Sequence, residues 1–230
     1  MAVDEVLLEV AGAEQIAYLR FYRWSEPTLS LGYFQRYEDR AAHAPSAGCA
    51  AVRRLSGGGA ILHDHEWTYS LALPVHSPLG KNAAATYDLV NEATLRTLAL
   101  FGVDARRASE FPTPSGEPFL CFERRSAGDL VLGVAPAAKI MGSAQRRRQG
   151  AILQHGSLLL RRSRFAPELP GIADLTVNID ELALVAEWSN AVCRALALDA
   201  EPKALTAGQV RLVQERAIEC FGNPVWTRRR

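Results

Sequence analysis

Three consecutive glycines at residues 57–59 follow two arginines, a leucine and a serine in the run RRLSGGG. The residues after the glycines restrict the fold most. A phosphate-binding Walker loop needs Lys-Ser or Lys-Thr directly after its glycines, and a dinucleotide-binding G-x-G-x-x-G run opens a helix. Here AIL at residues 60–62 is strand-like. The run therefore excludes both nucleotide-binding loops and predicts a glycine connection that leads into a strand.

Helical and strand periods are mixed along the rest of the chain. Strands are expected where branched and aromatic residues concentrate, at residues 16–22, 28–34, 60–62, 68–73, 130–132, 139–144 and 152–160. Helices are expected at residues 4–10, 85–101 and 180–196, and from Thr206, whose capping box with Gln209 starts a helix that ends before Gly222. Because strict βαβ alternation is missing, we predict an α+β fold of mixed β-sheets flanked by helices.

The domain organisation follows from length and composition. The 230 residues contain no internal repeat and no low-complexity linker. We therefore predict a single catalytic domain over residues 1–230, in which about residues 200–230 form a C-terminal helical appendage.

Charge and hydropathy exclude several classes of protein. The 26 basic and 25 acidic side chains give a net charge of +1, which is too balanced for a nucleic-acid-binding field. The N-terminus carries acids where a secretory signal carries bases, and no segment has the roughly 20 apolar residues needed to span a bilayer. With four widely spaced cysteines and no C-x-x-C pair, the chain is predicted to be cytoplasmic, with no nucleic-acid or membrane partner.

Two residue types single out candidate chemistry. Only three of the 26 basic residues are lysines, so Lys139, inside an expected strand, suggests a need for a compact point charge that arginine does not supply. The alternative is an ordinary solvating lysine at a strand edge. His63 and His65 alternate around Asp64 and would share a strand face, but no third ligand has helpful spacing. We therefore interpret these histidines as hydrogen-bonding residues of the scaffold and predict no metal site.

Four sequence blocks carry a resemblance to a known family. They are MAVDE at the start, RFYRWSEPTLSLGYFQ at residues 20–35, RRLSGGGAILHD at residues 53–64 and KIMGSAQRRRQGAILQHGSLLL at residues 139–160. In this order they resemble the lipoate–protein ligase and octanoyltransferase family. The resemblance implies the biotin/lipoate-attachment, class II synthetase-like fold.

Two branches of that family use different acyl donors. HDHEWTYS at residues 63–70 and Cys121-Phe122-Glu123 are similar to motifs of the cysteine-dependent octanoyltransferases, whereas Gly59-Ala60 is similar to the ATP-dependent ligases. The resemblance implies an acyltransferase of lipoate biogenesis. It moves an octanoyl or lipoyl group from acyl carrier protein, through a cysteine thioester, to a lysine of lipoyl domains of 2-oxoacid dehydrogenases or of glycine-cleavage H protein. The alternatives are an ATP-dependent lipoate–protein ligase and a non-catalytic member that only binds the carrier.

The resemblance also implies the roles of individual residues. Cys121 is the expected nucleophile, which attacks as a thiolate, and Lys139 is the expected cation that stabilises the thiolate and the developing oxyanion. The alternative for Cys121 is a buried structural thiol. No cofactor is expected, and ATP and Mg²⁺ are needed only by a ligase. The expected substrate-binding residues are Arg53, Arg54, Ser56, Gly57, Gly58, Gly59, His63, Gly142, Ser143, Ala144, His155 and Gly156.

The acyl group itself places simple demands on a pocket. Arg53 and Arg54 are expected to border an anion of the donor, and the glycines to admit a narrow aliphatic tail. Leu62, Ala72 and the strand at residues 152–160 are expected to supply apolar walls, worth about 0.8 kcal/mol per buried CH₂. The arginine clusters at residues 146–148 and 161–164 are expected to be solvated or to steer acidic carrier domains.

Overall fold

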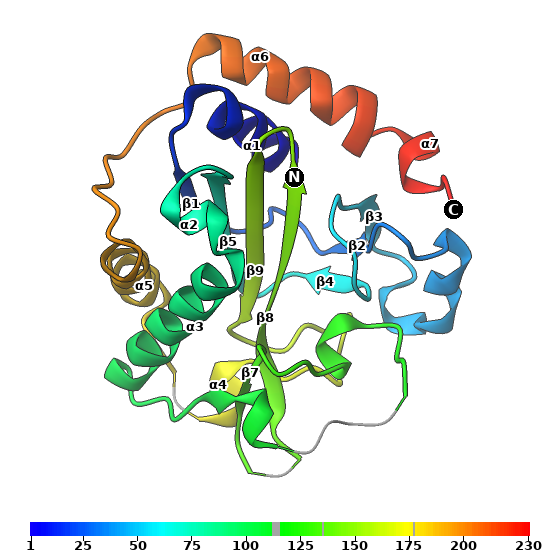
Figure 1. Cartoon of the computed structure of the whole chain (residues 1–230). Coiled ribbons are helices and arrows are strands. Elements are labelled where there is room, and N and C mark those ends of the chain that lie inside the picture. Colours follow the sequence, from blue (N-terminus) through cyan, green and yellow to red (C-terminus); the bar gives the residue numbers. More distant parts are fainter. Residues whose placement is uncertain (112–115, 135, 177) are drawn as a thin grey trace.

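The computed structural model describes residues 1–111, 116–134, 136–176 and 178–230 (Figure 1). The longer helices are α1 (Ala2–Glu14), α3 (Ala83–Leu100), α5 (Glu181–Ala195) and α6 (Ala207–Arg216). The strands are β1 (Tyr18–Tyr22), β2 (Thr28–Leu31), β3 (Ala50–Arg53), β4 (Ile61–His63), β5 (Glu66–Pro74), β6 (Arg106–Arg107), β7 (Leu130–Leu132), β8 (Ala138–Arg148) and β9 (Ala151–Leu159). Short helical segments are α2 (Pro78–Lys81), α4 (Ile172–Leu175), α7 (Pro224–Thr227), η1 (Tyr37–Ala42), η2 (Ala44–Ser46), η3 (Ala108–Glu110), η4 (Cys121–Glu123) and η5 (Ala217–Phe221).

Two sheets form within the described residues. The larger has six strands in the order β1-β5-β9-β8-β7-β6, and every neighbouring pair in it is antiparallel. The smaller has three strands in the order β3-β2-β4, with β2 and β3 parallel. The predicted α+β class of mixed sheets flanked by helices is confirmed.

The main core lies between the large sheet and two helices. Tyr69, Leu71 and Leu73 alternate along β5 and pack with residues of α3 and α5, where Trp188 is fully buried. The Trp188 indole donates a hydrogen bond to Thr94 on α3, which joins the two helices. In Figure 1, α3 and α5 lie on one side of β8 and β9, and the three-stranded sheet lies on the other side.

The opposite face of the large sheet changes character along its strands. On β9, Leu153 packs with Leu7, Leu8 and Ala72 beneath α1, and Leu159 packs with the small sheet. His155 and Ser157, which lie between them on the same face, are polar. Two apolar clusters thus leave a polar gap between α1 and the small sheet.

The C-terminal elements contact both α1 and the small sheet, which border this gap. α6 packs along α1, and α7 contacts β3 (Figure 1). The Trp226 indole donates to the Arg53 carbonyl oxygen at 2.9 Å, and the Arg53 guanidinium donates to the Thr227 carbonyl oxygen. The region expected to be an appendage therefore contributes hydrogen bonds to the strand that leads into the glycines.

Most expected elements occur, with shifted boundaries. The helix expected at residues 4–10 extends over Ala2–Glu14, and the strand expected at residues 139–144 extends over Ala138–Arg148. The strand expected at residues 28–34 ends earlier, at Leu31. None of the helices in the described ranges combines the length and the apolar composition needed to cross a membrane.

Candidate active site

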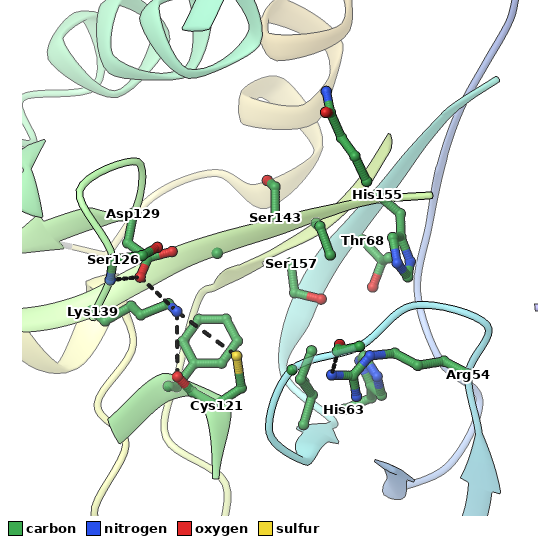
Figure 2. Close-up of a pocket in the computed structure, with 18 of the residues that line it drawn as sticks. Arg54, His63, Thr68, Cys121, Ser126, Asp129, Lys139, Ser143, His155 and Ser157 are labelled. Carbon is green, nitrogen blue, oxygen red and sulfur yellow. Dashed lines mark hydrogen bonds and ion pairs between the residues drawn. The ribbon is translucent and has the colours of Figure 1, made fainter. Parts of the chain in front are cut away.

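A cavity of about 380 Å³ opens at the junction of the two sheets. Its lining residues come from the glycine loop, from β4, β5, β8 and β9, and from the segment that follows Cys121. Figure 2 shows Cys121, Lys139 and Asp129 on one side of the cavity, and Arg54, His63 and His155 on the other. The polar gap on the large sheet is thus the floor of a pocket.

Cys121 is held at the pocket by the strand-like residues after the glycines. The Cys121 amide donates to the Ala60 carbonyl oxygen at 2.7 Å, and the Ala60 amide donates to the Phe119 carbonyl oxygen at 2.9 Å. Gly59 lies against this junction, since a Cβ there would be 3.1 Å from the Cys121 nitrogen. The glycine run therefore lets the segment that carries the cysteine approach the small sheet.

Lys139 extends from β8 toward the cysteine. Its ammonium nitrogen Nζ lies 3.9 Å from Cys121 Sγ and donates to the Cys121 carbonyl oxygen at 3.3 Å (Figure 2). The side chain is buried, and a Cβ on Gly142 would be 2.6 Å from Lys139 Cε. The two predicted catalytic residues are therefore adjacent, and Gly142 leaves the space through which the lysine passes.

Asp129, which we did not predict from the sequence, completes this group. Its carboxylate lies 2.8 Å from Lys139 Nζ, and the two side chains are only 2% and 4% exposed. The same carboxylate accepts the Ser126 amide at 2.7 Å. A buried ammonium needs a carboxylate or several acceptors, so a lysine inside an expected strand could have prompted a search for an acidic partner.

The remaining cysteines are poor candidates for a nucleophile. Cys49 is buried, and burial raises the pKa of Cys49 and of Cys193. Burial raises the pKa of Cys220 further, to about 11. Cys121 is the only one of the four that lines the pocket.

Arg54 and Arg53 differ from the expectation that both border an anion. Arg54 lines the pocket, but its two Nη nitrogens donate to the carbonyl oxygens of Ser30, Gly57 and Gly59. Burial lowers the pKa of Arg54 to about 10, while the nearby Cys121 thiol group acts in the opposite direction. Arg54 therefore keeps its charge at neutral pH, and its hydrogen bonds hold the glycine loop in place. That loop lies close to the cysteine, because a Cβ added at Gly58 would be 3.9 Å from Cys121 Sγ.

Arg53 does not line the pocket, and its predicted role in binding is not seen in this structure. The fully buried guanidinium donates to the carbonyl oxygens of Gly32, Tyr33, Gln35 and Thr227. All of these acceptors belong to the protein backbone. Successive residues of a strand face opposite ways, so Arg53 and Arg54 separate at the end of β3.

His155 and Ser56 meet at the wall opposite Cys121. His155 Nε2 and Ser56 Oγ are 2.6 Å apart, and Ser56 itself is buried behind the lining. Desolvation by burial lowers the pKa of His155 to about 4, so its imidazole is neutral at physiological pH. This wall therefore offers a neutral ring to a ligand.

His63 lines the pocket with both ring nitrogens already bonded. Nε2 lies 2.8 Å from Ser30 Oγ and Nδ1 lies 2.6 Å from Glu66 Oε1, while the ring stacks on Trp24 at 4.1 Å. Both ring nitrogens of His63 are therefore hydrogen-bonded within the protein. Within the described ranges, no group of three or more His, Cys, Asp or Glu side chains is arranged to hold a metal ion.

Of the expected walls, the strand at residues 152–160 borders the pocket through His155, Gly156 and Ser157, whereas Leu62 and Ala72 do not line it. Leu62 packs into the core of the small sheet, and its neighbour Ile61 lines the pocket with His63, because alternate residues of β4 share a face. Ala72 shares a face of β5 with Thr68, but the two are four residues, or about 13 Å, apart, so Ala72 lies beneath α1. Tyr22 and Trp24 are further lining residues that were not among the expected site residues, and Phe122 of the cysteine motif also lines the pocket.

The remaining expected residues do meet at the cavity. Its lining includes Gly57, Gly58, Gly142, Ser143, Ala144, His155 and Gly156. Gly59 and Ser56 lie immediately behind it. The motifs around the glycines and around Lys139, far apart in the chain, thus form one site.

The overall architecture is that of the class II synthetase-like lipoate ligases. A putative lipoate protein ligase from T. acidophilum, solved with bound lipoic acid, superposes with a TM-score of 0.78 at 23% identity, over 100% of this chain and 92% of that one. The fold implied by the sequence blocks is confirmed by this similarity.

The chain belongs to the lipoyl protein ligase A/B catalytic domain family, whose model matches residues 1–165. Octanoyltransferase LipM of Oceanobacillus iheyensis is 38% identical over 164 residues, which cover 70% of this chain and 59% of that protein. LipM of Brevibacillus brevis is 28% identical over 262 residues, covering 100% of this chain and 94% of that protein. The match to the first relative thus spans about 60% of its length.

Proposed function

We propose that the protein is an octanoyltransferase that forms an acyl-enzyme on Cys121. The observation that carries this proposal is the cysteine–lysine pair at 3.9 Å inside the pocket, with Asp129 behind the lysine. A thiolate beside a fixed cation is the arrangement that acyl transfer through a thioester requires. The octanoyltransferase name of the similar LipM proteins supports the same branch of the family.

The first half-reaction is a thioester exchange. The Cys121 thiolate attacks the carbonyl carbon of the octanoyl thioester, and the carbonyl oxygen takes up negative charge. Lys139 Nζ is close enough to Sγ to stabilise this charge electrostatically. When the tetrahedral intermediate collapses, the bond to the donor sulfur breaks, the carrier leaves as a thiolate that takes up a proton, and octanoyl-Cys121 remains.

The second half-reaction transfers the acyl group to an amine. The ε-amine of an acceptor lysine attacks the octanoyl-Cys121 carbonyl, an amide bond forms, and Cys121 leaves as thiolate. The amine loses one proton overall. The proposed donor is octanoyl-acyl carrier protein, and the proposed acceptors are lipoyl domains of 2-oxoacid dehydrogenases or glycine-cleavage H protein. We place the reaction in the cytoplasm.

The proposed reaction needs neither ATP nor Mg²⁺. A thioester is already activated toward nucleophiles, so no adenylate has to form. A ligase begins with a free acid and has to make an acyl adenylate, for which Mg²⁺ normally neutralises the phosphates. Dependence on nucleotide therefore separates the two branches.

Intact-protein mass spectrometry tests the proposal. Wild-type protein is incubated with octanoyl-acyl carrier protein in EDTA without ATP, and one octanoyl group is expected on the protein. The adduct should be absent from Cys121→Ala and present in Cys193→Ala, the matched control. If modification of a lipoyl domain instead requires free octanoate or lipoate with Mg-ATP, and Cys121→Ala retains it, the protein is a ligase. Binding of the carrier without any acyl transfer would identify a non-catalytic member.

A further inference from the structure

Four arginines gather over four aromatic rings next to the glycine loop. Arg229 lies over the rings of Tyr33 and Trp226, at 3.9 and 4.4 Å from their centroids. Arg146 also lies over the Tyr33 ring, at 4.8 Å from its centroid. We call this set the arginine–aromatic patch; its members are Arg146, Arg228, Arg229 and Arg230 with Tyr33, Phe34, Tyr37 and Trp226.

The patch carries positive charge that the protein does not neutralise. Within the described residues, none of its four arginines forms a salt bridge with a side-chain carboxylate, whereas Arg161, for example, pairs with Glu181. In the neighbouring η1, the Asp39 carboxylate accepts the Arg36 amide. For a chain whose net charge is only +1, this is a marked local excess.

The composition of the patch is typical of a protein interface. Tyr, Trp and Arg dominate binding hot spots, because they combine a large rigid area with charge. Phe34 is 66% exposed, so the patch also presents apolar surface to solvent. A purely solvated arginine cluster would have no need of this ordered stacking on rings.

The patch is continuous with the rim of the pocket. The Tyr33 amide donates to the Ser56 carbonyl oxygen, and a Cβ on Gly57 would be 3.7 Å from the Phe34 ring. Arg146 follows Ala144 and Gln145, which line the pocket on β8, and donates to the Leu55 carbonyl oxygen at 2.6 Å. A partner bound on the patch is therefore placed beside the entrance to Cys121.

We propose that the arginine–aromatic patch docks the acidic carrier protein that delivers the acyl thioester. This inference rests on the proposed function and adds the surface that recognises the donor. Guanidinium forks bind both carboxylates and phosphates, and an acyl carrier offers acidic side chains together with the phosphate of its prosthetic arm. Electrostatic attraction of this kind raises the association rate and positions the arm at the pocket.

Binding of the intact donor tests the patch independently of turnover. The Kd of octanoyl-acyl carrier protein is measured by fluorescence anisotropy for Cys121→Ala, alone and combined with Arg229→Gln and Arg230→Gln. The matched control carries Arg96→Gln and Arg106→Gln, which remove the same charge from exposed residues outside the pocket. We expect the Kd to rise about tenfold in the patch variant, to stay constant in the control, and to rise with salt.

A second measurement separates docking from chemistry. With Cys121 present, the patch variant should be acylated at the wild-type rate by a small octanoyl thioester that lacks a carrier protein. The docking proposal would be overturned by an unchanged Kd in the patch variant or by an equal rise of the Kd in the control. It would also be overturned if the patch variant lost affinity for the lipoyl domain and not for the carrier, or if the patch preferred single-stranded RNA. Failure of octanoyl-acyl carrier protein to acylate wild-type Cys121 would overturn the proposed function instead, while the Kd comparison would still decide the docking.

Discussion

At the scale of single residues, the site depends on how Lys139 is held. Its ammonium contacts Asp129 at 2.8 Å and the Cys121 carbonyl oxygen at 3.3 Å, so the carboxylate fixes the lysine between two oxygens. Among the described residues, Asp129 makes no hydrogen bond to Cys121 Sγ, so it acts through Lys139. Asp129 is therefore a positioning residue, whereas Lys139 and Cys121 touch the reacting atoms in the proposed mechanism.

Asp129→Asn should separate orientation from stability. The amide oxygen can still accept from the Ser126 amide and from the Lys139 ammonium, but the negative charge of the pair is lost, so Lys139 should be held less firmly. A misplacement of about 1 Å in a reacting group can cost about 10²-fold in rate. We expect the kcat for acyl-enzyme formation to fall by roughly this factor, with an unchanged KM for the small thioester. The melting temperature should also fall, because the buried Lys139 ammonium loses its countercharge. A lower melting temperature with an unchanged kcat of the folded variant would show that Asp129 is merely structural.

Gly142→Ala should displace the same lysine by crowding. The added methyl group would lie 2.6 Å from Lys139 Cε and 2.9 Å from Nζ, closer than van der Waals contact allows. We expect acylation of Cys121 to fall by about 10²-fold, measured by mass spectrometry over time. Gly48→Ala is the matched control, because a Cβ at Gly48 meets no atom within 4 Å. Equal rates in the two variants would mean that the lysine position is not limiting.

At the scale of secondary-structure elements, Arg53 at the end of β3 joins the segment between β2 and η1 to α7. Its guanidinium donates to the carbonyl oxygens of Gly32 and Gln35 in that segment and of Thr227 at the end of α7. A buried carbonyl that loses its donor costs about 1–3 kcal/mol. The bonds of one side chain thus hold the C-terminal helix against the small sheet, next to the loop that positions Cys121.

Arg53→Lys keeps the charge and tests this bracing role. An ammonium has three donors on one atom and does not reproduce the spread of the guanidinium fork, so some carbonyls should lose their partner. We expect the free energy of unfolding, measured in urea, to fall by about 2–4 kcal/mol. Arg96→Lys, on an exposed helix surface, should change it little. A variant of normal stability with a raised KM for the donor would restore the anion-binding hypothesis for Arg53.

At the scale of the whole molecule, the buried His155 links stability to pH. Burial lowers its folded-state pKa from 6.5 to about 4. Below pH 6.5 the unfolded chain therefore takes up a proton that the folded protein excludes. The contribution of His155 to the free energy of unfolding is complete above pH 6.5 and is lost as the pH falls toward about 4.

His155→Gln should flatten this part of the stability curve. Glutamine does not titrate and can bond Ser56, so the proton uptake disappears while the contact remains. Urea unfolding between pH 4 and 8 should give wild type an additional slope of at most about 1.4 kcal/mol per pH unit below pH 6.5, relative to the variant. Parallel curves for the two proteins would show that His155 is protonated in both states or in neither.

The amino-acid sequence alone determined most of the segments that form strands and long helices, though not β3 or β6, because alternation and helical period record burial locally. It also determined the family, through the blocks around the glycines and Lys139, and the pair Cys121 and Lys139 as the candidate chemistry. It did not determine the strand boundaries. The strand expected to end at residue 144 continues through the three arginines to Arg148. There, cross-strand bonds to β9 outweigh the polar composition of the segment.

Only the tertiary structure decided which neighbours of these motifs face the pocket. Arg53 and Arg54 are adjacent in the chain, but the Arg53 guanidinium donates to backbone carbonyl oxygens away from the pocket, whereas Arg54 lines the pocket. Ile61 lines the pocket in place of Leu62 because of the orientation of β4. Asp129 is recognised as the partner of Lys139 because β7 pairs with β8. The physical reason is that side-chain direction and the partners of buried charges depend on contacts between segments distant in sequence, which local pattern does not record.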